Sequence, residues 1–268
     1  MFSWKKIKGP IVGLSPMADY TDSPFSLMCK KFGVDIIYRE MVSADALIHG
    51  SEKTLKMAEF DKEERPIILQ IFGRDPGIMA KAASILEKKY KSDGIDINMG
   101  CPARKIVSAF KGSPPSQGGA RGGSGASLMN NPKLAAKIVR AVKKVVKVPV
   151  SVKVRTGWEE ETEILKFAPI IERAGADALA IHGRTKKQGF SGKANWEIVG
   201  QVKKKLKIPV LVNGDIVDSE SFKKAIKVSG ADGALIARGA LGRPWIFQDI
   251  RLCVKRTQSI AKLKKIIL

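Results

Sequence analysis

Short apolar runs rich in Val and Ile alternate along the chain with longer stretches in which apolar residues recur at helical spacing. Short β-branched runs are typical of buried strands, and the spacing between them is typical of amphipathic helices. We expect strands over residues 11–15, 35–40, 66–72, 94–99, 148–154, 176–182, 208–214 and 231–237.

The stretches between these runs carry recognisable helix ends. Asp22, Asp75 and Asn131 each stand one or two residues before a proline. A side-chain oxygen followed by proline in the first turn favours a helix start. Helices are expected to end at Gly33, Gly175 and Gly230.

Eight strands separated by helices predict a (β/α)₈ TIM barrel, with a doubly wound sheet as the alternative architecture. Internal similarity favours the barrel, because "AGADALAIHGR" (174–184) resembles "SGADGALIARG" (229–239). We expect residues 1–248 to form this domain. Residues 249–268 are enough for one basic helix, a truncated C-terminal segment.

Composition narrows the class of protein. The 268 residues include 48 Lys+Arg against 26 Asp+Glu, a net charge of +22 with pI near 10.0. This excess fits either a lysine-rich solvated surface or a polyanionic partner such as nucleic acid, and charge alone does not separate the two. Cys29, Cys101 and Cys253 are few and far apart, which argues against disulfides or a metal site. With no bilayer-spanning run and no secretory signal, a cytoplasmic location is expected.

In a barrel, chemistry belongs at the carboxyl ends of the strands. Polar residues follow every expected strand, so the sequence predicts a site there. They are Pro16–Met17–Ala18, Arg39–Glu40, Gln70, Asn98 with Cys101, Lys153 with Arg155, His182, Asn213–Gly214–Asp215 and Ala237–Arg238–Gly239.

The last two strand ends are typical of a phosphate pocket. They are followed by "NGD" and "ARGALGRPW", glycine-rich turns that leave N–H groups exposed. We expect a short helix starting near Gly242 to direct its positive end at an anion, with Arg238 beside it. Ordinary tight turning is the structural alternative.

Lys153 alternates with apolar neighbours in "VSVKVR", so it shares a face with Ser151 and Arg155. A lysine inside a barrel needs an anionic partner. With the amides of Gln70 and Asn98 it suits a flat heterocycle rich in carbonyl groups and ring nitrogens. Flavin mononucleotide (FMN) meets that description, whereas the absence of G-x-G-x-x-G after the first strand speaks against a Rossmann site.

Cys101 stands in a Gly–Cys–Pro turn just past a strand end. A lone cysteine is most often a small buried hydrophobic residue. At the mouth of a barrel it could instead be a nucleophile, or a general acid if it stays protonated, and spacing does not decide between these roles.

Taken together, "SPMADYTDSPFS" (15–26), "INMGCPARKI" (97–106), "VKVRTGW" (152–158), "IHGRT" (181–185) and "IARGALGRPWIF" (236–247) resemble the tRNA-dihydrouridine synthases, closest to their bacterial branch. The resemblance runs in order from about residue 8 to residue 250.

The resemblance implies an FMN enzyme that uses NADPH to reduce uridine in tRNA. Cys101 is then the general acid that protonates C5 of a flipped-out uracil, while the flavin passes hydride to C6. The residues expected to bind the cofactor are Pro16, Met17, Ala18, Gln70, Lys153, His182, Asn213, Gly214, Asp215, Ala237 and Arg238. The residues expected to bind substrate are Asn98, Lys105, Arg155 and Arg184.

Two stretches depart from the family pattern. Residues 108–123 are rich in Gly, Pro and Ser and form an insertion, either a neutral loop or a lid that touches RNA. Residues 249–268 stand where the family carries a helical tRNA-binding domain, of which they are a remnant or the start. The expected partner is tRNA; no protein partner is implied, and a monomer is expected.

Three alternatives stay open at this point. One is an FMN barrel dehydrogenase acting on a free pyrimidine, which needs no basic surface. Another is an RNA-binding relative that has lost catalysis. The third is a phosphate-binding barrel without flavin, which leaves Lys153 and Cys101 without a role.

Overall fold

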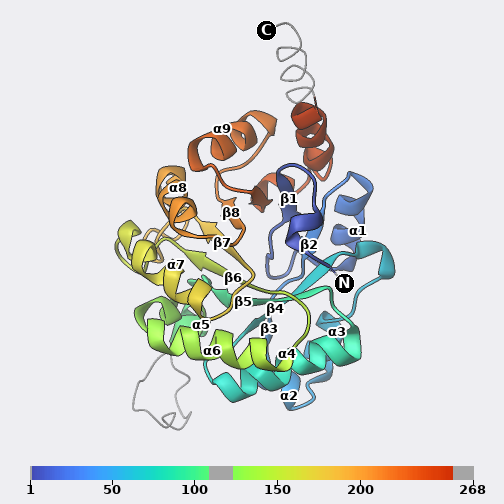
Figure 1. The fold of residues 1–268 in the computed structure, drawn as a ribbon. Helices are drawn as coiled ribbons and strands as arrows, with labels where there is room; N and C mark the ends of the chain where they lie inside the picture. The colour runs from blue at the N-terminus through green and yellow to red at the C-terminus, as the bar shows by residue number, and fades with distance from the viewer. Residues whose placement is uncertain (1, 109–122, 256–268) are drawn as a thin grey trace, which may run out of the picture.

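The computed structural model describes residues 2–108 and 123–255 as a parallel β-barrel surrounded by helices (Figure 1). The strands pair in the order β2-β1-β9-β8-β7-β6-β5-β4-β3, and a further pairing of β2 with β4 closes a ring of eight strands. Every strand pairing is parallel. The predicted TIM barrel is therefore confirmed.

The elements alternate along the chain as the hydrophobic pattern predicts. The strands are β1 (Ile11–Leu14), β2 (Ile36–Tyr38), β3 (Val42–Ser43), β4 (Ile67–Phe72), β5 (Gly94–Met99), β6 (Val150–Arg155), β7 (Ala178–His182), β8 (Val210–Asn213) and β9 (Gly233–Ile236). The α-helices are α1 (Ser23–Lys31), α2 (Ala44–Ile48), α3 (Glu52–Met57), α4 (Pro76–Tyr90), α5 (Arg104–Val107), α6 (Pro132–Val145), α7 (Ile164–Arg173), α8 (Trp196–Lys205) and α9 (Ser219–Ser229). Short 3₁₀ turns are η1 (Trp4–Lys6), η2 (Lys62–Glu64), η3 (Gly125–Asn130), η4 (Glu161–Glu163) and η5 (Arg238–Ala240).

The expected helix ends are confirmed. The side chains of Asp22, Asp75 and Asn131 accept hydrogen bonds from backbone N–H groups in the first turns of α1, α4 and α6, at 3.1, 2.8 and 3.1 Å. The three glycines expected at helix ends all have positive φ, at 82°, 103° and 58°.

Two local expectations were wrong. The expected strand at 35–40 ends at Tyr38, and the chain re-enters the sheet as β3, which pairs only with the far end of β4. The interruption coincides with Arg39, whose guanidinium turns away to Glu64 at 2.8 Å, both side chains being buried. Near Gly242 the chain makes a turn, and the next helix begins at residue 246.

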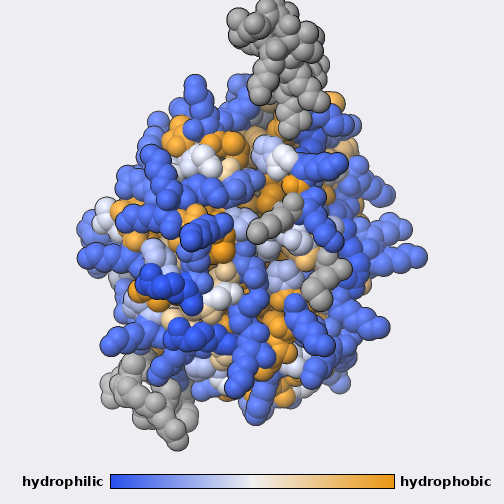
Figure 2. All heavy atoms as spheres, viewed as in Figure 1, coloured by the Kyte–Doolittle hydropathy of each residue, from blue (hydrophilic) through white to orange (hydrophobic). Residues whose placement is uncertain are grey.

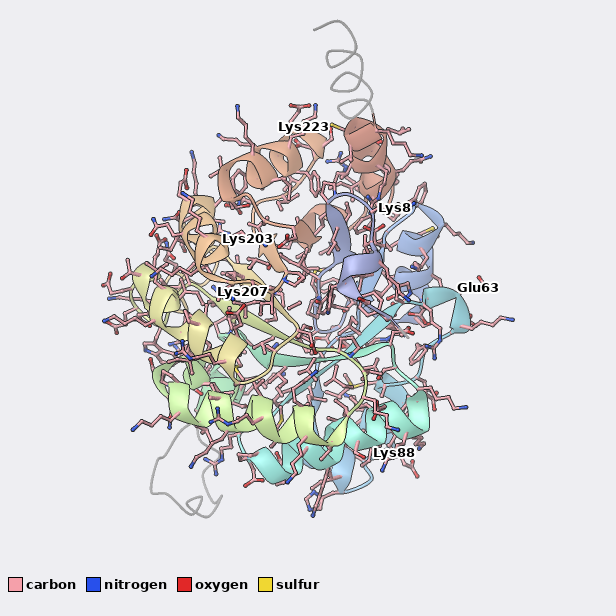
Figure 3. All side chains as sticks on the ribbon, in the orientation of Figure 1. Lys8, Glu63, Lys88, Lys203, Lys207 and Lys223 are labelled. Carbon is pink, nitrogen blue, oxygen red and sulfur yellow. The ribbon has the colours of Figure 1, made fainter. Side chains whose placement is uncertain are left out.

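Two apolar layers support the barrel. The larger lies between the sheet and the helices, and the smaller fills the amino-terminal part of the barrel interior. Trp4 plugs that end and is packed with Ile11, Ile36, Tyr38 and Leu235. Outside, the face shown in Figure 2 is covered mainly by polar side chains. Figure 3 shows side chains projecting outward, among them Lys88 from the last turn of α4.

The last described segment, residues 246–255, is helical. Its first turn belongs to the barrel, because Ile246, Phe247 and Ile250 are fully buried in the larger apolar layer. The remainder of the expected C-terminal segment, 256–268, lies outside the described residues. Within residues 2–108 and 123–255 no helix combines the length and apolarity that crossing a bilayer requires.

Candidate active site

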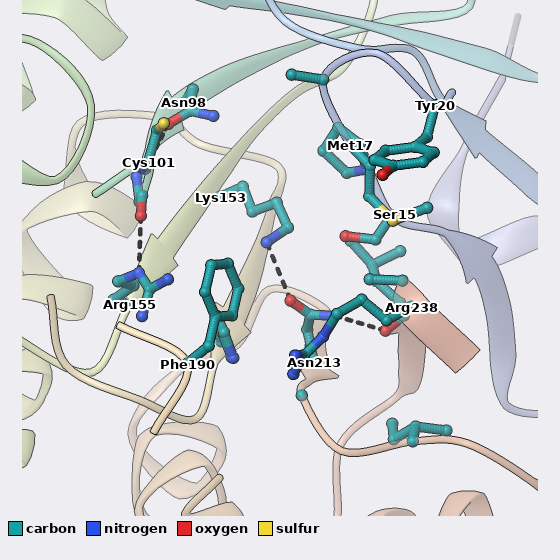
Figure 4. Close-up of a pocket in the computed structure, with 18 of the residues that line it drawn as sticks. Ser15, Met17, Tyr20, Asn98, Cys101, Lys153, Arg155, Phe190, Asn213 and Arg238 are labelled. Carbon is teal, nitrogen blue, oxygen red and sulfur yellow. Dashed lines mark hydrogen bonds between the residues drawn. The ribbon is translucent and has the colours of Figure 1, made fainter. Parts of the chain in front are cut away.

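A cavity of about 560 Å³ opens at the carboxyl ends of the barrel strands. Such a volume is ordinary for a pocket that holds a small molecule or cofactor. Figure 4 shows Cys101 and Asn98 on one side of it, Ser15, Met17 and Tyr20 on the other, and Lys153 reaching between the two sides.

Lys153 projects from β6 into the cavity, and its ammonium donates a hydrogen bond to Asn213 Oδ1 at 3.0 Å. Asn213 is held in turn, because its Nδ2 donates to the carbonyl of Leu235 at 2.8 Å. Burial is the main cause that lowers the pKa of Lys153 to about 8, and the nearby charge of Arg155 adds to it. Lys153 is therefore positive at neutral pH and close to releasing its proton.

His182 at the end of β7 is a neutral imidazole. Burial lowers its pKa to about 2, and the charges of Lys153, Arg155, Arg184 and Arg238 lower it further in the same direction. Arg184 Nη1 lies 3.4 Å from His182 Nε2. Since arginine only donates, Nε2 is an acceptor, and the ring proton belongs on Nδ1.

Arg155 ties the two loops at the mouth together. Its Nε donates to the carbonyl of Gly100 at 2.9 Å, beside Cys101, and its Nη1 donates to the carbonyl of Gly189 at 2.7 Å, beside Phe190. Phe190 is 60% exposed, and its ring centroid lies 5.6 Å from the guanidinium carbon of Arg155 and 4.9 Å from that of Arg238. This cation–π stack leaves an aromatic ring accessible at the cavity mouth.

The turn after β8 needs glycine. Gly214 has φ of 109°, and a Cβ there would meet His182 Cδ2 at 2.8 Å. The next residue, Asp215, lines the cavity, but its carboxylate accepts from Arg184 Nη2 at 2.8 Å and from the N–H of Ala194 at 2.7 Å. The only carboxylate among the described lining residues is therefore already paired.

Cys101 is half-buried in the turn that follows β5. Asn98 fixes this turn, since its Oδ1 accepts from the N–H groups of Gly100 and Cys101 at 3.1 and 2.9 Å. On the other side the carbonyl of Cys101 accepts from the N–H of Ala126 at 3.0 Å. Hydrogen bonds to both its N–H and its carbonyl therefore fix the backbone of Cys101, and with it the position of the thiol.

The insertion expected at 108–123 falls mostly on residues 109–122, which lie outside the described residues. Its two ends meet, because Ser124 donates through both its N–H and its hydroxyl to the carbonyl of Ile106, at 3.0 Å each. The chain therefore leaves and re-enters the barrel at one place, and Gly125 then packs against Cys101.

The structure brings most of the predicted residues together. All eleven predicted cofactor residues line the cavity, as do Asn98, Cys101 and Arg155. Lys105 and Arg184 do not line it. Lys105 is exposed on α5, and Arg184 is buried with its guanidinium on Asp215 and on the carbonyl groups of Ser191 and Gly192.

One strand end was wrongly placed at the site. Arg39 pairs with Glu64, and Glu40 accepts from the N–H of Asp19, so neither lines the cavity, and Met41 stands there instead. Sequence reasoning also missed Tyr20 and Phe190. Phe190 is a single aromatic in the polar, glycine-rich stretch "KKQGFSGK", a pattern that marks a loop and can mark a binding loop.

The lining suits an anionic, planar cofactor. Lys153, Arg155 and Arg238 supply positive charge, Gln70 and Asn213 supply amides, and Gly214 lets the backbone come close. The described residues contain no group of three or more His, Cys, Asp or Glu side chains placed to hold a metal ion. The cationic and amide side chains of the lining fit a flavin phosphate.

The chain belongs to the dihydrouridine synthase family. The family described as "Dihydrouridine synthase (Dus)" matches residues 13–266. The chain is 39% identical over 238 residues to tRNA-dihydrouridine synthase B of Pseudomonas aeruginosa, covering 88% of this chain and 68% of that protein. It is 38% identical over 239 residues to the probable tRNA-dihydrouridine synthase of Rickettsia bellii, covering 88% of this chain and 69% of that protein.

Solved structures share the fold at low identity. Morphinone reductase superposes with a TM-score of 0.62 at 13% identity, covering 90% of this chain and 85% of that one. Phosphoribosylanthranilate isomerase from Pyrococcus furiosus gives 0.55 at 15% identity, covering 92% and 99%. These likenesses support the barrel architecture alone.

Proposed function

We propose that this protein is an FMN-dependent tRNA-dihydrouridine synthase. The observation that carries the proposal is one cavity that joins the cationic lining to the thiol of Cys101, in a chain of the dihydrouridine synthase family. Its relatives that are named tRNA-dihydrouridine synthases supply the substrate class.

Pro16, Met17, Ala18, Gln70 and His182 would hold the ring system of FMN. Its phosphate would lie at the carboxyl ends of β8 and β9, against Asn213, Gly214, Asp215, Ala237 and Arg238. Lys153 would place positive charge beside the part of the ring where negative charge develops on reduction. When bound and reduced by NADPH, FMN supplies hydride to C6 of uracil.

Cys101 supplies the other half of the reduction. Its Sγ–H would donate the proton to C5, so the C5=C6 bond gains one hydride and one proton and the thiolate is reprotonated from solvent. Asn98 keeps the thiol in place through the backbone of its turn.

The uridine must leave its stack to reach this cavity. Phe190 would offer the extruded base or its neighbour an exposed aromatic ring at the mouth, with the guanidinium groups of Arg155 and Arg238 near that ring. Lys105 would contact the RNA backbone from α5, and the net charge of +22 favours the approach of a polyanion. Arg184 would shape the cavity mouth through its ion pair with Asp215.

The test is an anaerobic absorbance experiment on the purified chain. The expected result is an oxidised flavin band that NADPH bleaches and that returns when unmodified tRNA is added. Free uridine should leave the band bleached. A protein that takes up no added FMN contradicts the proposal, and so does a band that returns equally well with free uridine.

A further inference from the structure

Asp96 lies beneath the cavity and has no part in the proposal above. It belongs to β5, is fully buried and does not line the cavity. Both carboxylate oxygens are engaged, since Oδ1 accepts from Ser151 Oγ and Oδ2 accepts from Gln70 Nε2, each at 2.6 Å. Burial raises its pKa to about 6. The two hydrogen bonds and the positive charge of Lys153 act in the opposite direction, so this acid is held among polar partners beneath the cavity.

A continuous chain of hydrogen bonds runs from this carboxylate to the turn of Cys101. Gln70 donates to Asp96, and Gln70 Oε1 accepts from Asn98 Nδ2 at 2.9 Å. Asn98 Oδ1 then accepts from the N–H of Cys101 at 2.9 Å. Two amide side chains therefore connect a buried acid to the proposed general acid.

The two ends of this chain impose the same direction on both amides. The N–H groups of Gly100 and Cys101 can only donate, so Asn98 must turn its oxygen toward them and its Nδ2 toward Gln70. Gln70 must then present its oxygen to Asn98 and its Nε2 downward, where an acceptor is required. Asp96 Oδ2 is that acceptor. The second N–H of Asn98 lies on Met41 Sδ at 3.3 Å, which leaves that amide no other orientation.

We propose that Asp96 is a positioning residue that acts as a hydrogen-bond acceptor: through Gln70 and Asn98 it fixes the orientation of the turn that presents the Cys101 thiol to the cavity. The proposal deepens the proposed function and rests on it for the catalytic meaning of Cys101. What it requires of Asp96 is an oxygen that accepts, whether or not that oxygen carries charge.

Two substitutions of Asp96 distinguish a role as hydrogen-bond acceptor from a role that depends on its negative charge. Asp96→Asn keeps the chain of hydrogen bonds to Cys101, because the new Oδ1 can accept from Gln70 while the new Nδ2 donates to Ser151 Oγ. Asp96→Leu has a similar size and removes the acceptor. Ser151→Ala is the matched control, because it removes the other partner of Asp96 and leaves the chain to Cys101 intact.

The readout is the rate at which iodoacetamide alkylates Cys101 in the FMN-loaded protein, with Cys253→Ser as background because Cys253 is the other half-buried thiol. Asp96→Leu should raise this rate about tenfold, the equivalent of one lost buried hydrogen bond. It should lower kcat on tRNA by a similar factor with little change in KM. Asp96→Asn and Ser151→Ala should both match the parent.

An unchanged rate in Asp96→Leu overturns the proposal. So does an Asp96→Asn variant as altered as Asp96→Leu, because charge would then be what matters. If Asp96→Leu does not fold, Gln70→Met cuts the same chain at its next link, and an unchanged alkylation rate there overturns the proposal equally. Alkylation needs no tRNA, so it tests the positioning role separately from the activity. If Asp96→Leu raises the alkylation rate as expected but the parent protein does not act on tRNA, the proposed function is wrong and the positioning role stands.

Discussion

The two ends of the barrel carry charge in opposite ways. At the amino end, four aspartates stand directly before alternate strands, and each has two partners, a backbone N–H near the start of the preceding strand and a cation. The sets are Asp35 with Val12 and Arg251, Asp93 with Ile67 and Arg65, Asp177 with Val150 and Lys143, and Asp232 with Val210 and Lys203.

At the carboxyl end, positive charge exceeds the acids beside it, of which Asp96 lies beneath the cavity near Lys153. Lys153, Arg155 and Arg238 line the cavity, and the one carboxylate among the described lining residues, Asp215, is bound to Arg184. Charges satisfied within the fold contribute to stability. Positive charges that outnumber the acids beside them cost stability and favour an anionic ligand. The amino end of the barrel therefore serves folding and the carboxyl end serves chemistry, and substitutions at the two ends should affect different properties.

Substitution of Cys101 at the carboxyl end should have the largest effect. Cys101→Ala removes the proposed proton donor, so kcat on tRNA should fall by about 10²–10⁴-fold, the usual contribution of general acid catalysis. Flavin content and the rate of flavin reduction by NADPH should be unchanged, as stopped-flow absorbance can show. Cys253→Ala is the matched control with full activity. Unchanged turnover in Cys101→Ala would make the general-acid role wrong.

Lys153→Met should weaken FMN binding by about 10–100-fold, the range of a hydrogen bond to a charged group. The pKa of Lys153 is lowered to about 8. The ammonium is therefore present below that pH, and FMN affinity should fall as the pH rises through about 8. In Lys153→Met this part of the pH dependence should vanish. Flavin fluorescence titrations at several pH values measure both, and an identical pH profile in the two proteins would contradict the assignment.

Phe190→Leu should raise the KM for tRNA about fivefold, the lower end of what one stacked base contributes. FMN affinity and kcat should change little, because the ring is 60% exposed at the mouth. Steady-state kinetics on tRNA separate the two parameters. Phe190→Tyr keeps an aromatic face and should restore KM, so a tyrosine variant as weak as the leucine variant would exclude stacking.

Asp177→Ala tests the amino end and should have the smallest effect. It leaves the N–H of Val150 without its acceptor, which should lower the free energy of unfolding by about 1 kcal/mol. Lys143→Met removes only the partly exposed ion pair and should cost at most about 0.5 kcal/mol. Urea unfolding measures both. FMN affinity of the folded protein should be unchanged, and a tenfold loss in Asp177→Ala would break the division between the two ends.

Sequence patterns predicted most of the barrel because strands buried on both faces are continuous apolar runs. The cavity lining followed from topology, since residues directly after parallel strands meet at one end. This placed Gln70, Lys153, His182 and Asn213 together without knowledge of any side-chain contact.

Side-chain pairing was beyond the sequence. Arg39 and Arg184 look like their neighbours at strand ends, yet Glu64 and Asp215 bury them in ion pairs. Phe190 lies at the cavity mouth because Arg155 of β6 donates a hydrogen bond to the carbonyl of Gly189, in the loop that follows β7. The interruption between β2 and β3 likewise depends on the ion pair between Arg39 and Glu64. Each of these outcomes rests on contacts between residues distant in the chain.

The most direct test of the central claim is the product itself. The FMN-loaded protein is incubated with NADPH and an unmodified tRNA transcript, and the digested nucleosides are analysed by mass spectrometry. The account predicts dihydrouridine in proportion to the NADPH consumed, with none formed from free uridine under the same conditions. NADPH consumption without dihydrouridine in the tRNA, or equal reduction of free uridine, would contradict it.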